Sequence, residues 1–200
     1  MSARDARAAR EPGARPDIEP SDGLLVERVR DGDRDAYCTL VQRHQEELYR
    51  YARGLRLDHD VASDLVQEAF VTGYTRLHQC ADPERFRFWV FRILRNRSLD
   101  WLRDIRRNSV ALDDVTLRAG GRSPSDAASG AELRHTLERA LASLTDELRE
   151  AFLMKHHEGR DYNEMSELTG ASVSAMKMRV HRAREALRET LIEAGVGFGM

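Results

Sequence analysis

Arginine and aromatic residues alternate between Phe86 and Asn96, where the sequence reads FRFWVFRILRN. Arginine binds phosphate and aromatic rings stack on unpaired bases. Proteins that bind single-stranded nucleic acid combine the two, with stacking contributing roughly 1–3 kcal/mol per base. The alternative is that the rings belong to a hydrophobic core. Trp89 and Phe91 fit both interpretations. Four other residues are expected in the core in either case: Phe86, Val90, Ile93 and Leu94.

Charges of opposite sign are segregated around this stretch. From Asp58 to Thr75 there is no Lys or Arg but there are four acidic residues. From Arg85 to Arg107 there are eight arginines and only two acidic residues, Asp100 and Asp104. An acidic segment suits a basic protein surface, and an arginine-rich segment suits nucleic acid. The pattern predicts that neighbouring elements bind two different partners.

A second basic surface is expected near the C-terminus, where Gly170 separates a short helix, Tyr162–Thr169, from a longer basic one. This order is typical of a helix-turn-helix, whose second helix enters the major groove. Lys and Arg reach guanine edges or phosphates, and Met178 can contact a thymine methyl group. The alternative is an amphipathic surface helix with solvated charges. One face should be core, with Met176, Val180, Ala183 and Leu187, and the other carries Ser174, Lys177, Met178, His181 and Arg182, flanked by Arg179 and Arg184.

Helices must position these residues, because apolar residues recur at helical spacing and no strand pattern is convincing. Helix starts are expected at Ser21-Asp22, at Asp33 or Asp35, at Asp58 or Asp60, and at Thr145-Asp146. After the break at Asp82-Pro83, the fourth helix should run from about Glu84 to about Arg107. Later helices should begin near Ala131, end near Glu158-Gly159, and then span 162–169 and 173–191.

The expected fold is all-α, with two small helical domains joined by a flexible linker. Residues 108–130 contain Gly120-Gly121 and Ser123-Pro124-Ser125 with few large apolar residues, which suits a tether. The C-terminal domain is the helix-turn-helix. The expected boundaries are a disordered tail over 1–22, a first domain over 23–107, the linker over 108–130, the second domain over 131–192 and a tail over 193–200.

Composition argues against several classes. The net charge of −2 over 200 residues does not suit a generic nucleic-acid coat. Cys38 and Cys80 match no metal-ligand spacing, which predicts reduced thiols in a cytoplasmic protein without a metal or other cofactor. No apolar run approaches the roughly 20 residues of a membrane span, so membrane insertion is not expected. His156 and His157 are adjacent and cannot share a helix face as ligands do. No nucleophile motif or phosphate loop appears, so an enzyme is not expected.

Two sets of motifs resemble bacterial sigma factors. The segments DLVQEAF from Asp64, FWVFRILRN from Phe88 and LDWLR from Leu99 resemble the second conserved region. The segments LASL from Leu141, YNEMS from Tyr162 and MKMRVHRAR from Met176 resemble the fourth region. With only a linker between them, the chain is similar to the extracytoplasmic-function (ECF) group over about residues 24–191.

The resemblance implies partners and roles. The chain would bind core RNA polymerase, at its clamp coiled coil and flap, and direct it to specific promoters. A loop over 80–87 would hold a flipped base of the minus-ten element, and the following helix would meet the edge of the melted duplex. The implied residues are Asp64, Gln67 and Glu68 for polymerase; Cys80, Asp82, Arg85, Arg87, Arg92, Arg95, Asn96 and Arg103 for minus-ten DNA; and Ser174, Lys177, Met178, Arg179, His181 and Arg182 for double-stranded minus-thirty-five DNA.

The chain also departs from the family pattern. Ala175 and Met178 stand where the family usually has Thr and Ser, so a hydroxyl at 175 and a polar group on the reading face at 178 are missing. The group often serves stress or envelope responses and is often held by a separate anti-sigma factor, which is expected here. The alternative function is a two-domain helix-turn-helix regulator that binds DNA without being a polymerase subunit. The acidic face with Asp64 and Glu68 distinguishes the two.

Overall fold

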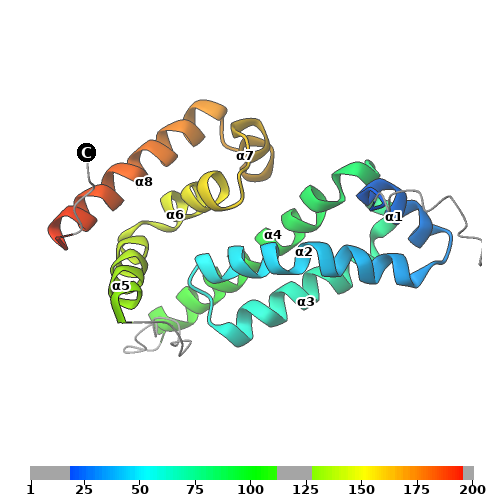
Figure 1. Cartoon of the computed structure of the whole chain (residues 1–200), viewed down its shortest axis with the longest axis horizontal. Helices are drawn as coiled ribbons and strands as arrows, with labels where there is room; N and C mark the ends of the chain where they lie inside the picture. Colours follow the sequence, from blue (N-terminus) through cyan, green and yellow to red (C-terminus); the bar gives the residue numbers. More distant parts are fainter. Residues whose placement is uncertain (1–18, 112–127, 196–200) are drawn as a thin grey trace, which may run out of the picture.

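The computed structural model describes residues 19–111 and 128–195, and within these ranges the chain is helical with no strand (Figure 1). The expected linker centre, 112–127, and the tails 1–18 and 196–200 lie outside the described residues. The all-α, two-domain prediction is confirmed. The proposed domain boundaries, and the flexibility of the linker and tails, stay predictions.

The N-terminal domain consists of four helices and two short 3-10 turns. Capping side chains start the first three helices, because Ser21, Asp33 and Asp58 each accept a hydrogen bond from a backbone N–H of the first turn. Each is among the residues expected to cap. The elements are α1 (Asp22–Arg30), α2 (Arg34–Gly54), α3 (His59–Thr75), η1 (Leu77–Gln79), η2 (Pro83–Arg85) and α4 (Phe86–Ala111).

The core of this domain is aromatic. Phe91 is fully buried, with its ring centroid 4.5 Å from that of Tyr51 on α2. The hydroxyl of Tyr37 donates to the backbone carbonyl of Phe70 at 2.5 Å and so ties α2 to α3. Trp89 is also buried, at 8% exposure. The core interpretation of the α4 aromatics is therefore confirmed, and the stacking-platform interpretation is wrong.

The C-terminal domain holds a capped helix-turn-helix. Asp161 and Glu164 form a capping box at the start of α7, and Gly170 takes the left-handed conformation (φ 74°) at its end. Arg149 is buried and donates to the carbonyls of Leu141, Ala142 and Leu144, which satisfies the end of the preceding helix. The elements are α5 (Ala128–Ser143), α6 (Asp146–Phe152), the π-helix η3 (Leu153–His157), α7 (Tyr162–Thr169) and α8 (Val173–Glu193).

Several helix boundaries differ from expectation by a few residues, among them the start of α4 at Phe86 rather than Glu84 and the end of α8 at Glu193 rather than Leu191. Helix α4 continues to Ala111, past Arg107, because residues 108–111 contain neither Gly nor Pro to end it. Helix α5 begins at Ala128, three positions before Ala131. The π-helical turn η3 was not anticipated. It continues α6 directly and ends before Gly159, whose φ of 65° agrees with the expected helix end.

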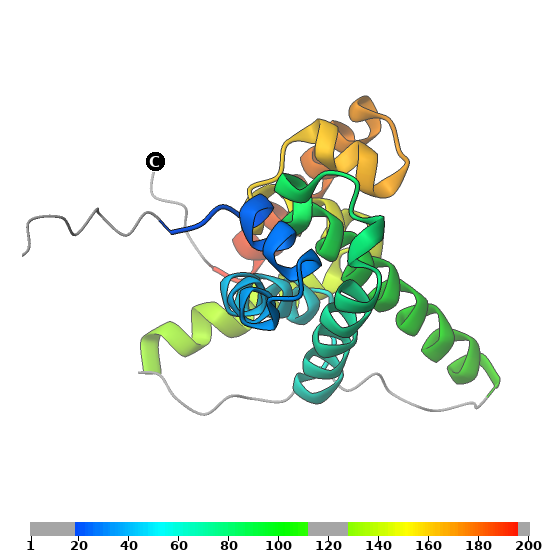
Figure 2. The same cartoon turned by 90° about the vertical axis from the view of Figure 1, so that its right-hand side faces the viewer.

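The two domains pack against each other. One cluster of buried apolar residues extends from α1–α4 into η3, α7 and the first half of α8, with Leu153 and Met154 at the junction. In both views α7 and α8 lie on one side of the N-terminal domain and α3 lies on the opposite side (Figure 1, Figure 2). The acidic helix therefore faces away from the helix-turn-helix.

Candidate nucleic-acid and protein interfaces

The acidic face of α3 is open to solvent. Asp64, Gln67 and Glu68 are exposed, whereas Leu65 and Phe70 on the other face are buried. Helical periodicity separates the two sets, since residues three and four apart share a face. The structure thus brings the three predicted polymerase-binding residues together on one accessible surface.

An apolar groove that the sequence did not predict runs beside this face. It lies between α2 and α3 and has a volume of about 1110 Å³. Val71 and Tyr74 line it and are 58% and 43% exposed. Large apolar side chains this exposed on neighbouring turns mark interaction surfaces. The sequence does contain a sign of this groove. Val71 and Tyr74 add apolar side chains to α3 beyond those that its buried face needs.

The loop between α3 and α4 is held by specific contacts. Arg30 on α1 donates to the carbonyls of Cys80 and Leu77, at 2.6 and 3.3 Å. The thiol of Cys80 is buried and donates to the Asp82 carbonyl at 3.3 Å. Burial raises the pKa of this thiol. Cys80 therefore shapes the loop from inside. Arg30, which positions the loop, was missed because it lies on a different helix.

Within the loop, Asp82 uses its carboxylate to cap η2 by accepting from the Glu84 N–H. Arg85 is exposed and its guanidinium lies 4.2 Å above the Phe88 ring. These contacts fix the direction of the loop at the start of α4. Of the predicted loop residues, the side chains of Asp82, Arg85 and Arg87 are exposed and that of Cys80 is not.

The predicted residues along α4 differ in exposure and in whether they are paired with a carboxylate. Arg92, Asn96 and Arg103 are exposed, with Arg103 paired to Asp100 of the same helix. Arg95 is different, because its side chain is only 12% exposed and contacts Glu150 of α6. Arg87 pairs with Glu47 on α2 at 2.8 Å, and the Glu47 carboxylate raises the pKa of Arg87. Helix α4 thus presents a basic row of which part is already occupied.

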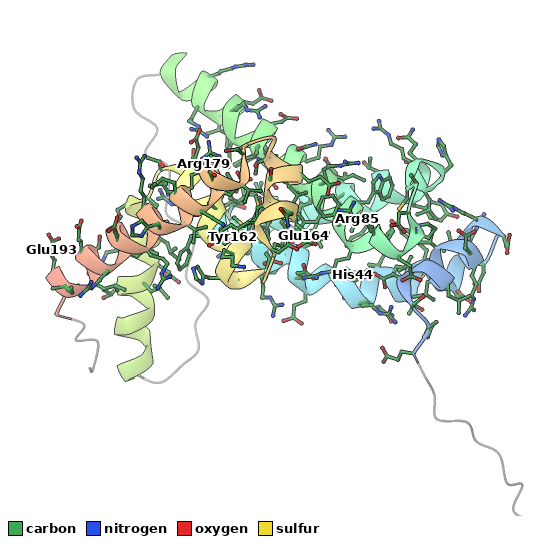
Figure 3. All side chains as sticks on the ribbon, turned by 90° about the horizontal axis from the view of Figure 1, so that it is seen from above. His44, Arg85, Tyr162, Glu164, Arg179 and Glu193 are labelled. Carbon is green, nitrogen blue, oxygen red and sulfur yellow. The ribbon has the colours of Figure 1, made fainter. Side chains whose placement is uncertain are left out.

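The predicted reading face of α8 is exposed. Its apolar partners Met176, Val180, Ala183 and Leu187 are buried, as expected. Met178 is 49% exposed. Arg179 is partly buried and pairs with Glu147 at 2.9 Å. Figure 3 labels Arg179 on α8 and Arg85 in the N-terminal domain, so the two predicted DNA-binding surfaces belong to different domains. The remaining predicted residues of this face are all solvent-exposed: Ser174, Lys177, His181 and Arg182.

Neither a metal cluster nor a membrane span is present among the described residues. No three His, Cys, Asp or Glu residues within 19–111 and 128–195 are grouped to hold a metal ion. Within the same ranges no helix is long and apolar enough to cross a bilayer. Three helices of the described residues carry the exposed charge of these predicted surfaces: the basic α4 and α8 and the acidic α3.

Comparisons with known proteins identify both domains. Sigma-70 region 2 matches residues 40–108 and Sigma-70, region 4 matches residues 134–187. The ECF RNA polymerase sigma factor SigW of Bacillus subtilis (strain 168) is 27% identical over 83% of this chain and 94% of that protein. The ECF RNA polymerase sigma-E factor of Escherichia coli (strain K12) is 30% identical over 84% of this chain and 92% of that protein.

Two solved structures are also similar to this chain over most of its length. The sigma factor RpoE of Bartonella quintana, solved with the anti-sigma factor NepR, superposes with a TM-score of 0.69 at 26% identity, covering 78% of this chain and 96% of that one. CnrH, solved with the cytosolic domain of CnrY, gives a TM-score of 0.65 at 28% identity over 88% of this chain and 99% of that one.

Proposed function

The chain belongs to the extracytoplasmic-function group of RNA polymerase sigma factors, and we propose that three separate surfaces carry its role in promoter recognition. The acidic face of α3, with Asp64, Gln67 and Glu68, docks on the clamp of core RNA polymerase. The loop before α4 and the exposed arginines of α4 bind the minus-ten element. The polar face of α8 binds the minus-thirty-five element.

The observation that supports this assignment best is the separation of charge over the N-terminal domain. Asp64 and Glu68 are exposed on α3, whereas Arg92 and Arg103 are exposed on α4. Complementary charge steers a protein to the correct partner and fixes its orientation. Docking of α3 on a basic surface would thus hold the basic row of α4 where duplex DNA opens. The work is binding rather than catalysis, because capture of a separated strand favours opening.

Regulation by a separate anti-sigma factor is part of the proposal. The relative from Bartonella quintana was solved with such a partner, NepR. A sigma factor works where the polymerase is, so the chain would act in the cytoplasm. Affinity purification from the native cell should recover a small partner besides polymerase. Recovery of polymerase subunits alone would argue against an inhibitor.

The polymerase assignment is tested by Asp64→Ala combined with Glu68→Ala. Loss of charge complementarity should weaken core polymerase binding by tenfold or more, which corresponds to about 1.4 kcal/mol or more. Binding of the isolated chain to promoter DNA should stay unchanged. Asp31→Ala with Asp35→Ala is a matched control, since it removes the same charge from exposed positions. Unchanged polymerase affinity in the α3 variant would favour the alternative, a helix-turn-helix regulator that acts without polymerase.

A further inference from the structure

Helix α1 holds both ends of the loop between α3 and α4. At the last residue of α1, Nη2 of Arg30 donates to the carbonyl of Cys80 at 2.6 Å and to that of Leu77 at 3.3 Å. At the start of α1, the hydroxyl of Ser21 donates to Oε1 of Glu84 at 2.8 Å. Figures 1 and 2 show α1, in blue, beside the segment that leads into α4. The loop is therefore supported along the whole length of one helix.

The contact made by Arg30 is charge-assisted. A guanidinium binds a carbonyl more strongly than a neutral donor does. A cation is also favourable at the end of a helical turn, where carbonyl groups lack partners further along the helix. Nη1 of the same guanidinium donates to Glu27 of α1 at 2.7 Å, so the group is oriented on its own helix. Arg30 thus fixes the point at which η1 ends and the loop begins.

The contact made by Glu84 is close as well as polar. Gly23 in the first turn of α1 is buried, and a Cβ atom at this position would lie 2.6 Å from Cδ of Glu84. Only a residue without a side chain lets Glu84 approach so near. A carboxylate is favoured there, because the first N–H groups of a helix carry partial positive charge. The backbone N–H of Glu84 donates to Asp82, so Glu84 and the cap of η2 are fixed together.

Helix α1 can support the loop because it is itself anchored on α2. Its Leu25 and Val26 are buried in the core of the N-terminal domain. Asp22 accepts from Arg43 at 2.6 Å and lies 2.7 Å from Nε2 of His44. A binding site is held more precisely when packed helices support it than when a loop must order itself. The chain of contacts runs from α2 through α1 to the loop.

We propose that Arg30 and Glu84 are positioning residues for promoter recognition, which hold the loop over 80–85 ready to receive an unpaired base of the minus-ten element. The inference rests on the proposed role of this loop. Arg30 acts through the loop and not on DNA. A loop that is already in its binding conformation loses less entropy on binding, and apparent affinity scales with the fraction of chains in that conformation. Polymerase docking on α3 does not depend on these contacts.

Loop order is measured first, by hydrogen exchange in the free, full-length chain. Arg30→Met keeps an unbranched side chain and removes the donors. The amides of Cys80 and Arg85 are hydrogen-bonded within the loop and should exchange about threefold to tenfold faster in this variant. Arg30→Lys keeps a charged donor and should restore most of the protection. The matched control is Arg28→Met, because Arg28 has the same charge on the same helix but pairs with Asp33.

A steric variant tests the other end of α1. Gly23→Ala places a methyl group where Glu84 lies, so the amide of Arg85 should exchange faster. Leu24→Ala changes the neighbouring residue, which is 54% exposed, and should leave the loop unchanged. A variant that merely destabilised the domain would speed exchange in α2 and α3 as well. Faster exchange confined to the loop therefore separates positioning from folding.

Promoter opening is measured with the holoenzyme, which is core polymerase with the full-length chain. The template is a promoter recovered from genomic fragments by run-off transcription, and permanganate reactivity of unpaired thymines reports open complexes. In a second set of templates each minus-ten nucleotide of the captured strand is abasic in turn, which removes the base that the loop would receive. Arg30→Met should lower open complexes about threefold to tenfold on the intact promoter and little further on the abasic template that weakens wild type most. Arg30→Lys should recover most of the loss, and Arg28→Met should match wild type.

Three outcomes would contradict the inference. Equal loop exchange in wild type and Arg30→Met overturns it and leaves the proposed function standing. Equal losses on the intact and abasic templates also overturn it, because they show an effect unrelated to base capture. A loosened loop with unchanged opening of the intact promoter overturns the proposed minus-ten role of the loop, and the inference with it.

Discussion

Leu153 of the C-terminal domain packs so closely on Gly54 of α2 that a Cβ atom at Gly54 would lie 2.8 Å from both methyl carbons of Leu153. Gly54→Ala should therefore push the domains apart. The substitution should not harm the N-terminal domain itself, because Gly54 is the last residue of α2 and has no positive φ, so Ala fits its backbone conformation without strain. Energy transfer between a dye on the exposed Cys38 of α2 and a second dye on Ile192→Cys of α8 should fall or rise away from the value of the protein with Gly54, because the distance between the domains changes.

The matched variant Gly54→Ala with Leu153→Ala tests the reason. Removing the leucine methyl groups makes room for the new Cβ, so part of the closed signal should return. If the double variant is more open than Gly54→Ala alone, steric contact between these two residues is not what holds the domains at their present distance.

Acid should favour the closed form of the chain, in which the two domains pack against each other, over an open form in which they are apart. Glu158 is the group through which pH acts. Burial raises the pKa of Glu158 to about 7, and the hydrogen bond and charge of Glu47 add to the shift. Because the closed form binds this proton more tightly than the open form, closure is strongest below the ordinary pKa of 4.5 and weakens as pH rises toward about 7. The charged or titratable groups around this carboxyl are Glu47 on α2, Arg87 on α4, His157 on η3, Arg160 after it and Glu164 on α7.

Energy transfer measured from pH 8 to pH 5.5 checks this. The ratio of closed to open chains should rise by at most about tenfold per pH unit, the limit for one linked proton. Glu158→Gln should flatten the profile. A profile as steep as wild type in Glu158→Gln would show that Glu158 is not the group that binds the linked proton.

A buried ion pair anchors the first helix of the N-terminal domain. Asp22 on α1 lies 2.7 Å from Nε2 of His44 and also pairs with Arg43, both on α2. Burial opposes ionisation of Asp22, but these partners outweigh it, so its pKa is lowered. The stabilisation is present above the unfolded pKa of about 3.8 and is lost as pH falls through the folded value.

Asp22→Ala should lower the free energy of unfolding by roughly 1–3 kcal/mol at pH 7, because it leaves His44 buried without its partner. Urea denaturation gives the value. The control is Glu27→Ala, which removes a carboxylate of the same helix that is 54% exposed. It should change stability by less than about 1 kcal/mol. Equal losses in the two variants would show that burial of the Asp22 pair adds nothing.

Met178 should read thymine. It is a large apolar side chain, 49% exposed, on a face whose other exposed residues are polar: Ser174, Lys177, His181 and Arg182. Met178→Ala should weaken binding to the chain's own minus-thirty-five duplex by about 1 kcal/mol, roughly fivefold. Ile192→Ala, at the other end of α8 and 55% exposed, should leave the affinity unchanged.

Replacing each thymine of that duplex by deoxyuridine removes the methyl groups. Wild type should lose affinity at one position, and Met178→Ala should lose nothing further there. If deoxyuridine weakens both proteins equally at every position, the contact is made by another side chain.

Local features of the fold could be predicted from the sequence, and the contact between domains could not. Caps at Asp33 and Asp58 and the turn at Gly170 follow from residue types and spacing within one helix turn. The pairing of Arg95 with Glu150 joins residues 55 positions apart. It depends on how two complete domains fit together, which no local pattern encodes. Arg95 was therefore placed correctly on a basic helix, while its partner was missed.

The same reason explains the remaining differences at the site. Cys80 was assigned to the DNA-binding loop from its position in the motif, but its burial depends on Arg30 of α1 holding the loop. The choice between stacking and core for Trp89 and Phe91 depended on which neighbouring helices cover them, and residue types alone allowed both. Phe91 packs on Tyr51 of α2, and Trp89 is buried close to Gly73 of α3.

Transcription with purified core RNA polymerase is the most direct test of the promoter-recognition role. A library of genomic fragments from the native organism serves as template, and run-off products are sequenced with and without the chain. Core polymerase with the chain should give defined start sites that share two upstream elements, and Asp64→Ala with Glu68→Ala should strongly reduce the products at the same protein concentration. Identical products with and without the chain would contradict a sigma function.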